Sequence, residues 1–247
     1  MSWLRTVCQE GKMMRELRPP LGRRERSKRD KRERILIAAR ELFAADGVGG
    51  VTTQQIADRA DVAIGTLFLY ASTKAELLIM VQNDKFAAAI DEGLAAIAAE
   101  TTENPDPLES VMAVLGPVVV CAREQIENGR VYLHELVFGD PAEPNRRDGL
   151  ARAARLEDGI AHVLARGGAI EEAQAATLAR VVGAIIHISV TATIHMPQSD
   201  TAVLEDIRGQ LSAVLASQQA GAVPVRAEAV GVAAPVMERR ESGKMVA

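Results

Sequence analysis

Residues 51–77 read VTTQQIADRADVAIGTLFLYASTKAEL, and this stretch decides the fold that we expect for the chain. Thr52 and Gln55 have the spacing of a capping box, in which each side chain bonds the backbone N–H of the other residue. Val51 and Ile56 have the spacing of a hydrophobic staple across the same helix start. A short helix therefore begins directly after Thr52.

A second short helix and the start of a third follow within the same stretch. Asp61-Val62 forms the turn, and the second helix is predicted over Ala63–Tyr70. Thr73 and Glu76 form another capping box, which opens the third helix. Two helices that cross steeply approach closely only where side chains are small. Small residues occupy the expected crossing at Ala57, Ala60 and Gly65.

This pattern is typical of a helix-turn-helix, whose second helix enters the DNA major groove while the first crosses the backbone. The residues that we predict to contact DNA are Thr52, Thr53, Gln54, Ala63, Ile64, Thr66, Phe68, Leu69, Tyr70 and Lys74. Apolar side chains at the groove favour contacts with thymine methyl groups. The alternative is an ordinary helical hairpin that touches no nucleic acid, and these start signals alone leave both open.

Composition predicts an all-α protein. Apolar residues make up 48% of the 247 residues and aromatic residues only 3%, with long runs of Ala, Leu and Val. Cys8 and Cys121 fit neither a metal-site spacing nor a disulfide framework. Neither a signal peptide nor a membrane-spanning segment is expected, because Val111–Ala122 and Val181–Met196 are too short or too polar. We expect a soluble, cytoplasmic protein without a cofactor.

Charge divides unequally along the chain. Residues 1–34 contain twelve Lys and Arg against five Asp and Glu, a net charge of +7, which leaves −11 for the rest because the total is −4. A basic end on an acidic body is typical of a DNA-binding end attached to another domain. Residues 1–27 are expected to be a flexible basic arm, which either follows DNA phosphates or is only a solvated tail.

Helical periodicity divides the remaining chain. We expect the first helix from Asp30, because apolar residues from Ile35 to Phe43 share one face. The expected domains are a DNA-binding domain over residues 28–80, a helical effector-binding and dimerisation domain over 81–217, and a disordered tail over 218–247. The further helices are expected at 74–102, 106–129, 130–138, 144–166, 170–196 and 200–217.

Residues 28–80 resemble the N-terminal DNA-binding domain of the TetR/AcrR transcriptional regulators. The parts arrive in order: I-L-x-A-A-x-x-L-F, a glycine, T-T-x-x-I-A-x-x-A, G-T-L-F-x-Y and K-x-x-L-L. The resemblance implies DNA binding through a helix-turn-helix and a larger helical C-terminal domain that dimerises and usually binds a small effector.

The sequence departs from the pattern of that family inside the helix-turn-helix. Asp61 stands where glycine is usual, and Ala63 stands where Ser or Thr usually caps the second helix, a loss of about 1 kcal/mol. Phe68 replaces a frequent Tyr, and Ala71 replaces a large aromatic residue. These changes affect DNA affinity and contact details rather than the fold.

The region of residues 170–196 is apolar nearly all round, which indicates a helix buried on more than one side. Together with 200–217 it is expected to form a four-helix bundle across a two-fold axis, and the resemblance implies the same arrangement. Ile186 and Val190 are the residues that we expect at this interface. The alternative is a core helix of a monomer.

The effector pocket is the least readable part of the sequence. Residues that are large, or that carry a polar tip in an apolar context, are expected to line it: Met80, Phe86, Met112, Tyr132, Phe138, His162 and His187. The alternative is that they are ordinary core residues, which large residues in an apolar context more often are. A mostly aliphatic lining indicates an effector that is a hydrophobic small molecule with few polar groups.

No catalytic constellation is visible in the sequence. His134 and Glu135 are adjacent, so they point in different directions on a helix. His187 and His195 share a helix face, yet no carboxylate or thiol joins them at metal-ligand spacing. Cys121 lies in an apolar run without a partnering base. We therefore expect neither an enzyme nor a metal site.

These observations predict a homodimeric, ligand-responsive repressor that binds palindromic double-stranded operator DNA. An effector-independent architectural DNA-binding protein is the alternative. A helical enzyme or scaffold with a degenerate DNA-binding head is a weaker one, supported only by the missing cap at Ala63.

Overall fold

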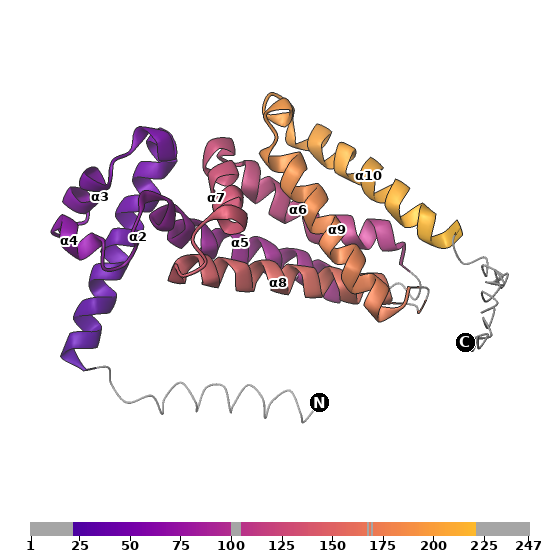
Figure 1. Cartoon of the computed structure of the whole chain (residues 1–247), viewed down its shortest axis with the longest axis horizontal. Helices are drawn as coiled ribbons and strands as arrows, with labels where there is room; N and C mark the ends of the chain where they lie inside the picture. Colours follow the sequence, from indigo (N-terminus) through magenta and orange to yellow (C-terminus); the bar gives the residue numbers. More distant parts are fainter. Residues whose placement is uncertain (1–21, 100–104, 167, 169, 221–247) are drawn as a thin grey trace, which may run out of the picture.

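The computed structural model describes residues 22–99, 105–166, 168 and 170–220, and these residues form an all-helical fold without strands. Figure 1 shows a small head, in which the long first helix carries two short ones, joined to a larger bundle. The helices are α2 (Arg23–Gly50), α3 (Thr53–Arg59), α4 (Ile64–Leu67), α5 (Lys74–Ala98), α6 (Pro107–Arg123), α7 (Ile126–Phe138), α8 (Pro144–Ala165), α9 (Glu172–Thr191) and α10 (Asp200–Ala220).

The head consists of α2, α3 and α4 around an apolar centre. Its buried residues include Ile35 and Phe43 of α2, Ile56 of α3 and Leu67 of α4. The predicted capping box is present, since the Gln55 N–H donates to Thr52 Oγ1 at 3.2 Å and the Thr52 N–H donates to Gln55 Oε1 at 2.8 Å. The capping box that the sequence predicts at Thr52 and Gln55 is therefore confirmed.

The first helix is longer than expected. It begins at Arg23 rather than Asp30, so the last residues of the expected flexible arm, 23–27, are helical. Residues 1–21 of that arm lie outside the described part of the chain. Gly47 interrupts the helix with a φ of 69°, a conformation that glycine adopts without strain. At the other end, α10 continues to Ala220, past the expected start of the tail, and residues 221–247 are not described.

Two helices of the bundle end earlier than the sequence indicated. The helix expected over 106–129 ends at Arg123, and α7 begins at Ile126, because the chain folds back on itself there. Gly129 permits this fold, since a Cβ atom at that position would lie 1.8 Å from the carbonyl oxygen of Ala122. Helix α9 ends at Thr191 instead of Met196, because Ala192 is extended.

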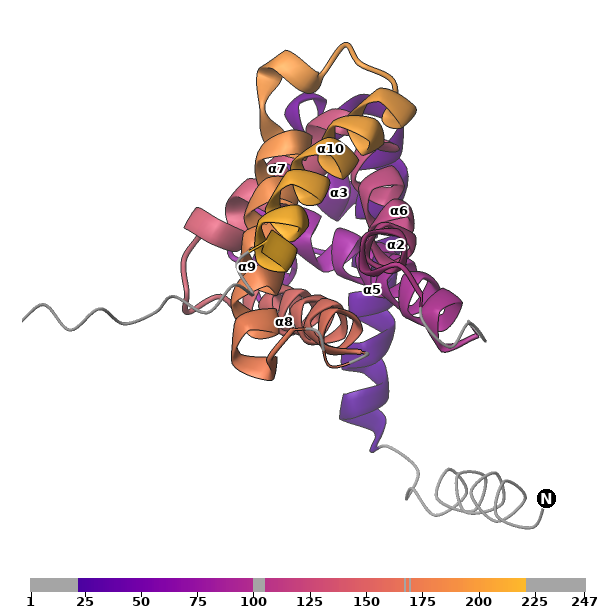
Figure 2. The same ribbon diagram turned by 90° about the vertical axis from the view of Figure 1, so that its right-hand side faces the viewer.

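Helix α5 runs from the head into the bundle and packs against α6, α7 and α8 (Figure 1). Helices α9 and α10 lie at the end of the molecule remote from the head, and they face the viewer in Figure 2. By length and composition, α9 is the one helix among the described residues that could cross a membrane, with a mean hydropathy of 1.4. It packs against α6, α7, α8 and α10, which is typical of a core helix.

Asn128 of α7 joins the bundle to the end of α2. Its Oδ1 accepts the Val48 N–H at 2.7 Å, and its Nδ2 donates to the carbonyl oxygen of Phe43 at 2.9 Å. Asn128, Phe43 and Val48 are all buried, so water cannot replace the Asn128 side chain as the partner of these two backbone groups. One side chain therefore satisfies both backbone groups at this junction.

We predict that Asn128→Ala lowers the free energy of unfolding by about 2–4 kcal/mol, because it leaves two buried backbone groups unpaired. Urea unfolding followed by circular dichroism measures this change. Asp91→Asn is the control, since it removes only an exposed ion pair with Arg155 and should change stability by less than about 1 kcal/mol. Equal stability of wild type and Asn128→Ala would contradict this account of the junction.

Candidate DNA-binding face and ligand cavity

The second helix of the helix-turn-helix is a single turn. It covers Ile64–Leu67 instead of Ala63–Tyr70, and the following three residues continue in turns. Leu67 is completely buried and anchors the helix, whereas Phe68 is 44% and Leu69 83% exposed. These two apolar side chains can therefore contact another molecule. Of the other residues predicted to contact bases, Ala63 is exposed and Ile64 and Thr66 are half-buried.

The turn before this helix explains one departure from the family pattern. Asp61 has a φ of 51°, in the left-handed region that favours glycine. Arg34 compensates by donating to both the carbonyl oxygen and the carboxylate of Asp61, at 3.2 and 3.0 Å. Ala63 provides no side-chain cap for the helix, as its side chain implies.

The predicted phosphate contacts flank this helix on both sides. Thr52, Thr53 and Gln54 lie at the start of α3 and are exposed or half-buried. Lys74 is half-buried, and its ammonium donates to the carbonyl oxygen of Val51 at 3.0 Å. Tyr70 donates its hydroxyl hydrogen to the carbonyl oxygen of Lys28 at 3.0 Å. Lys74 and Tyr70 therefore tie neighbouring segments to the helix-turn-helix.

A basic groove runs between the first two turns of α2 and the end of α4. Its volume is about 560 Å³, and its lining residues are Arg23, Arg24, Ser27, Lys28, Lys31, Thr66, Leu69 and Tyr70. The acidic residues of the same helix turns do not line it. The basic charge was predictable from the sequence but the groove was not, because residues 23–27 have no apolar periodicity that would indicate a helix there.

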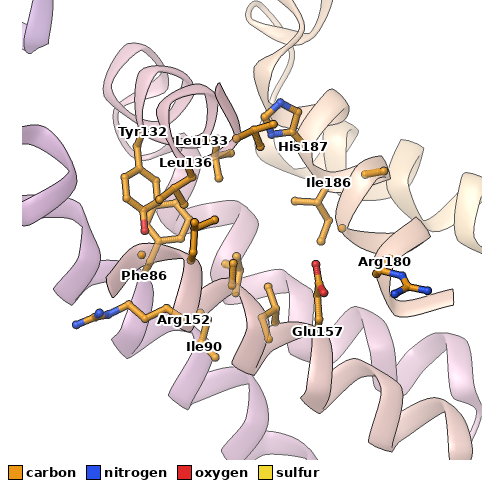
Figure 3. A pocket seen from close by; sticks show the side chains of 18 of the residues that line it. Phe86, Ile90, Tyr132, Leu133, Leu136, Arg152, Glu157, Arg180, Ile186 and His187 are labelled. Carbon is orange, nitrogen blue, oxygen red and sulfur yellow. The ribbon is translucent and has the colours of Figure 1, made fainter. Parts of the chain in front are cut away.

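A second cavity, of about 450 Å³, lies within the bundle (Figure 3). Phe86 and Ile90 of α5 and Tyr132 of α7 form one wall, and Ile186 and His187 of α9 form the opposite one. Residues 149–160 of α8 lie between these walls. The lining is mostly aliphatic and aromatic, and it also includes the charged residues Arg152, Glu157 and Arg180.

Three of the seven predicted pocket residues, Phe86, Tyr132 and His187, line this cavity. Met80 is buried in the core, and Met112 lies in a groove between α6 and α10. Phe138 is 68% exposed and His162 is exposed, so neither reaches the cavity. Residue size did not separate core from cavity, and the prediction did not include the charged lining residues Arg152, Glu157 and Arg180.

Tyr132 and His187 carry polar groups in the cavity wall. The Tyr132 hydroxyl donates to Asn83 Oδ1 at 3.0 Å, and burial raises the pKa of Tyr132, so the hydroxyl remains protonated. Burial lowers the pKa of His187, and the charge of nearby His134 lowers it further. His187 is therefore neutral at pH 7, and it adds an imidazole to a mostly apolar wall that also carries the Tyr132 hydroxyl and the three charged residues. The residues that the structure describes contain no cluster of His, Cys, Asp and Glu that could hold a metal ion.

The comparisons with known proteins agree on the head. Residues 35–81 match the family model described as bacterial regulatory proteins, tetR family. The HTH-type transcriptional repressor KstR of Mycobacterium tuberculosis (strain ATCC 25618 / H37Rv) is 38% identical over 61 residues, which cover 25% of this chain and 28% of KstR. KstR of Rhodococcus jostii (strain RHA1) is 30% identical over 95 residues, 37% of this chain and 41% of that protein. The chain thus matches less than half the length of either relative.

One solved structure illustrates the likeness of the whole fold. Thermus thermophilus FadR, described as a TetR family transcriptional repressor in complex with lauroyl-CoA, has a TM-score of 0.58 and 22% sequence identity. The alignment covers 86% of this chain and all of FadR. At that identity it shows the fold alone. The resemblance to TetR-type regulators and the all-helical fold class are therefore confirmed.

We predict that the His187 imidazole titrates below its ordinary pKa of 6.5, as measured by NMR of the labelled ring. Since the folded pKa is lower than the unfolded one, the unfolded state binds more protons just below pH 6.5. The contribution of His187 to stability is therefore present above that window and is lost as the pH falls through it. His134→Gln should raise the pKa of His187, because it removes the neighbouring positive charge. An unchanged titration would contradict the proximity of the two rings.

Proposed function

We propose that this chain is a homodimeric transcriptional repressor that binds operator DNA through its helix-turn-helix and releases it when a hydrophobic effector enters the bundle cavity. The carrying observation is the joint presence, on one end of the molecule, of a capped helix-turn-helix with exposed Phe68 and Leu69 and of the adjoining basic groove. Such a repressor acts in the cytoplasm, where its operator lies.

DNA contact follows from the two surfaces together. Phe68 and Leu69 are apolar and exposed, which suits contact with thymine methyl groups in the major groove. Arg24, Lys28 and Lys31 line the basic groove directly beside Leu69. A backbone phosphate next to the occupied major groove would meet these cations. Base contacts and phosphate contacts then come from adjoining surfaces of one rigid head.

The homodimer is supported by the outer face of α9 and α10 (Figure 2). Ile188 is 61% and Val181 37% exposed on one side of α9, where Ile188 and Ala184 also line the cavity. The exposed face of α10 includes Ala202, Gly209 and Ala213, which allow a second helix to approach closely. Ile186 and Val190, which the sequence suggested for the interface, are instead buried within the protomer.

The effector class is inferred from the cavity. Its volume of about 450 Å³ and its mostly apolar walls suit a long hydrocarbon group. Arg180 is exposed and also lines the cavity, so it can pair with an anionic head at the rim. FadR of Thermus thermophilus is described in complex with lauroyl-CoA. A fatty acyl thioester is therefore the first effector to test.

An architectural DNA-binding protein without an effector remains the second candidate, and the cavity weighs against it. DNA sequences selected from a random pool by the purified protein supply the operator, and fluorescence anisotropy then measures binding with and without lauroyl-CoA. We expect one palindromic motif and weaker binding with lauroyl-CoA. Selection of no motif would contradict the repressor, whereas a motif whose binding ignores every acyl thioester would favour the architectural protein.

We predict that the double variant Arg24→Ala, Lys31→Ala binds the operator and unrelated DNA more weakly by similar factors. The slope of log affinity against log salt should fall by about 1.8, because each phosphate contact contributes roughly 0.9. Anisotropy titrations between low and moderate salt measure the slope. Arg155→Ala is the control, since it removes a positive charge from α8, outside the basic groove, and should leave the slope unchanged. A double variant with the wild-type slope would place DNA away from this groove.

We predict that Gly209→Glu dissociates the dimer without harming the protomer. A Cβ atom at Gly209 meets nothing within 4 Å in the protomer, and Glu favours a helix over Gly by up to about 1 kcal/mol. A long charged side chain would separate two α10 helices that pack closely. Light scattering after size exclusion should give a folded monomer, while the control Ala154→Glu on exposed α8 stays dimeric. A dimeric Gly209→Glu protein would move the interface elsewhere.

A further inference from the structure

We propose that Tyr132, Asn83 and Asn145 form a buried hydrogen-bond relay that carries occupation of the bundle cavity to the end of the recognition helix α4. This inference rests on the proposed function, because it names how the proposed effector regulates DNA binding. The three residues are positioning residues, since they act on DNA through Tyr70 and do not touch DNA themselves.

The relay has three links from three helices. The Tyr132 hydroxyl of α7 donates to Asn83 Oδ1 of α5 at 3.0 Å. Asn83 Nδ2 donates to the backbone carbonyl oxygen of Asn145 in the first turn of α8 at 2.9 Å. Asn145 Nδ2 donates to the backbone carbonyl oxygen of Tyr70 at 3.2 Å. Tyr70 directly follows the two exposed apolar residues after α4, so the relay ends at the DNA-binding face.

Burial makes each link matter. Tyr132, Asn83 and Asn145 are all buried, so a polar atom that loses its partner cannot turn to water. Asn83 uses both ends of its amide, one toward the cavity and one toward α8. A change at its Oδ1 therefore affects the bond that its Nδ2 makes.

The cavity reaches the first link. Tyr132 lines it, and in Figure 3 the Tyr132 hydroxyl lies beside Phe86 at one end. Gly149 also lines the cavity, and a Cβ atom there would lie 2.8 Å from Asn83 Oδ1 and 3.6 Å from the Tyr132 hydroxyl. The Leu136 side chain fills the space over Gly149, 2.5 Å from the same Cβ position, so Tyr132 is the link that an effector in the cavity can reach. An effector that moves the Tyr132 ring, or accepts its hydroxyl hydrogen, removes the donor from Asn83.

The consequence runs along α8. Asn83 without its Tyr132 donor rotates to find another partner, and the carbonyl oxygen of Asn145 then loses its own donor. Asn145 is held in the first turn of α8, and its side chain fixes the carbonyl group of Tyr70. Release of this bond frees the segment after α4 to shift relative to the bundle. The relay thus has two arrangements, one for the empty cavity and one for the occupied cavity.

The test is a double-mutant cycle on the coupling factor, the ratio of operator Kd with saturating lauroyl-CoA to that without it. Tyr132→Phe removes the first link and keeps the ring, whereas Asn145→Ala removes the last link and keeps the backbone oxygen. Coupling factors are commonly about 5–150. We expect each variant to lower the factor by about fivefold or to abolish it, and the double variant to lower it no further than the stronger single one. Calorimetry of lauroyl-CoA binding corrects for altered effector affinity.

Ser189→Ala is the matched control, because it removes another buried hydroxyl of the same domain, one that contacts Gln210 and not the relay. Its coupling factor should equal that of the wild type. Two outcomes would overturn the relay. One is a double variant whose coupling factor falls by the product of the two single reductions, and the other is single variants that keep the coupling factor of the wild type.

A measurement on the protein without effector tests the relay independently of whether lauroyl-CoA is the effector. In the free protein, Tyr132→Phe should speed hydrogen exchange in the peptide covering residues 68–73 by about threefold, while Ser189→Ala should not. If lauroyl-CoA does not weaken operator binding by the wild type, the proposal of an acyl thioester effector is wrong. The hydrogen-exchange rates then test the relay on their own. Exchange that is equal in wild type and Tyr132→Phe then overturns it.

Discussion

The buried carboxylate of Glu76 holds the head and the bundle in one arrangement. Glu76 lies in the first turn of α5, where the Thr73 side chain caps the helix, and it accepts the backbone N–H groups of Asn145 and Arg146, each at 3.2 Å. It thereby caps α8, whose N-cap residue Glu143 makes no side-chain cap bond. Burial raises the pKa of Glu76, and the hydrogen bonds from Asn145 and Arg146 oppose that rise. One side chain thus joins the starts of two helices at the place where the head ends.

The same junction gives the bundle cavity its position relative to DNA. Helix α5 carries Glu76 at its start, Asn83 two turns later and Phe86 in the cavity wall. The Gly93 position lets α6 approach α5, since a Cβ atom there would lie 2.4 Å from the Val114 carbonyl oxygen. The cavity, the junction and the DNA-binding face therefore share one rigid element, and a change at one is transmitted over a short distance.

Local chemistry was readable from the sequence, and contacts between helices were not. The capping box at Thr52, the Thr73 side-chain cap and the start of α6 at Asp106 and Pro107 depend only on residues within one turn, and all were predicted. The other half of the predicted Thr73 box is absent, because the Glu76 carboxylate binds the start of α8 instead. The break between α6 and α7 depends on the approach of Gly129 to Ala122, and a period of apolar residues carries no signal for it.

The cavity was predicted only in part for the same reason. Phe86 and Tyr132 were chosen for size, and that property also describes Met80, which packs in the core instead. A helical period tells which face is apolar, but not whether the neighbouring helix fills the space against it. Arg180 and Glu157 were not among the predicted residues, because charge on a helix face usually indicates exposure to solvent, yet both line the cavity.

The weak construction of α4 explains how so small a relay can control DNA binding. A helix of one turn has little stability of its own, and Ala63 adds no cap. Its position depends on the buried Leu67 and on the bonds that Tyr70 makes to Lys28 and Asn145. Asp61 before it already occupies a left-handed conformation, which Arg34 stabilises. A helix held by a few tertiary contacts moves when one of them changes, whereas a long, well-capped helix would resist the same change. Asp61 and Ala63, which depart from the family pattern, therefore make α4 one of the less stable parts of the fold. In such an element the loss of a single buried hydrogen bond is enough to shift its position.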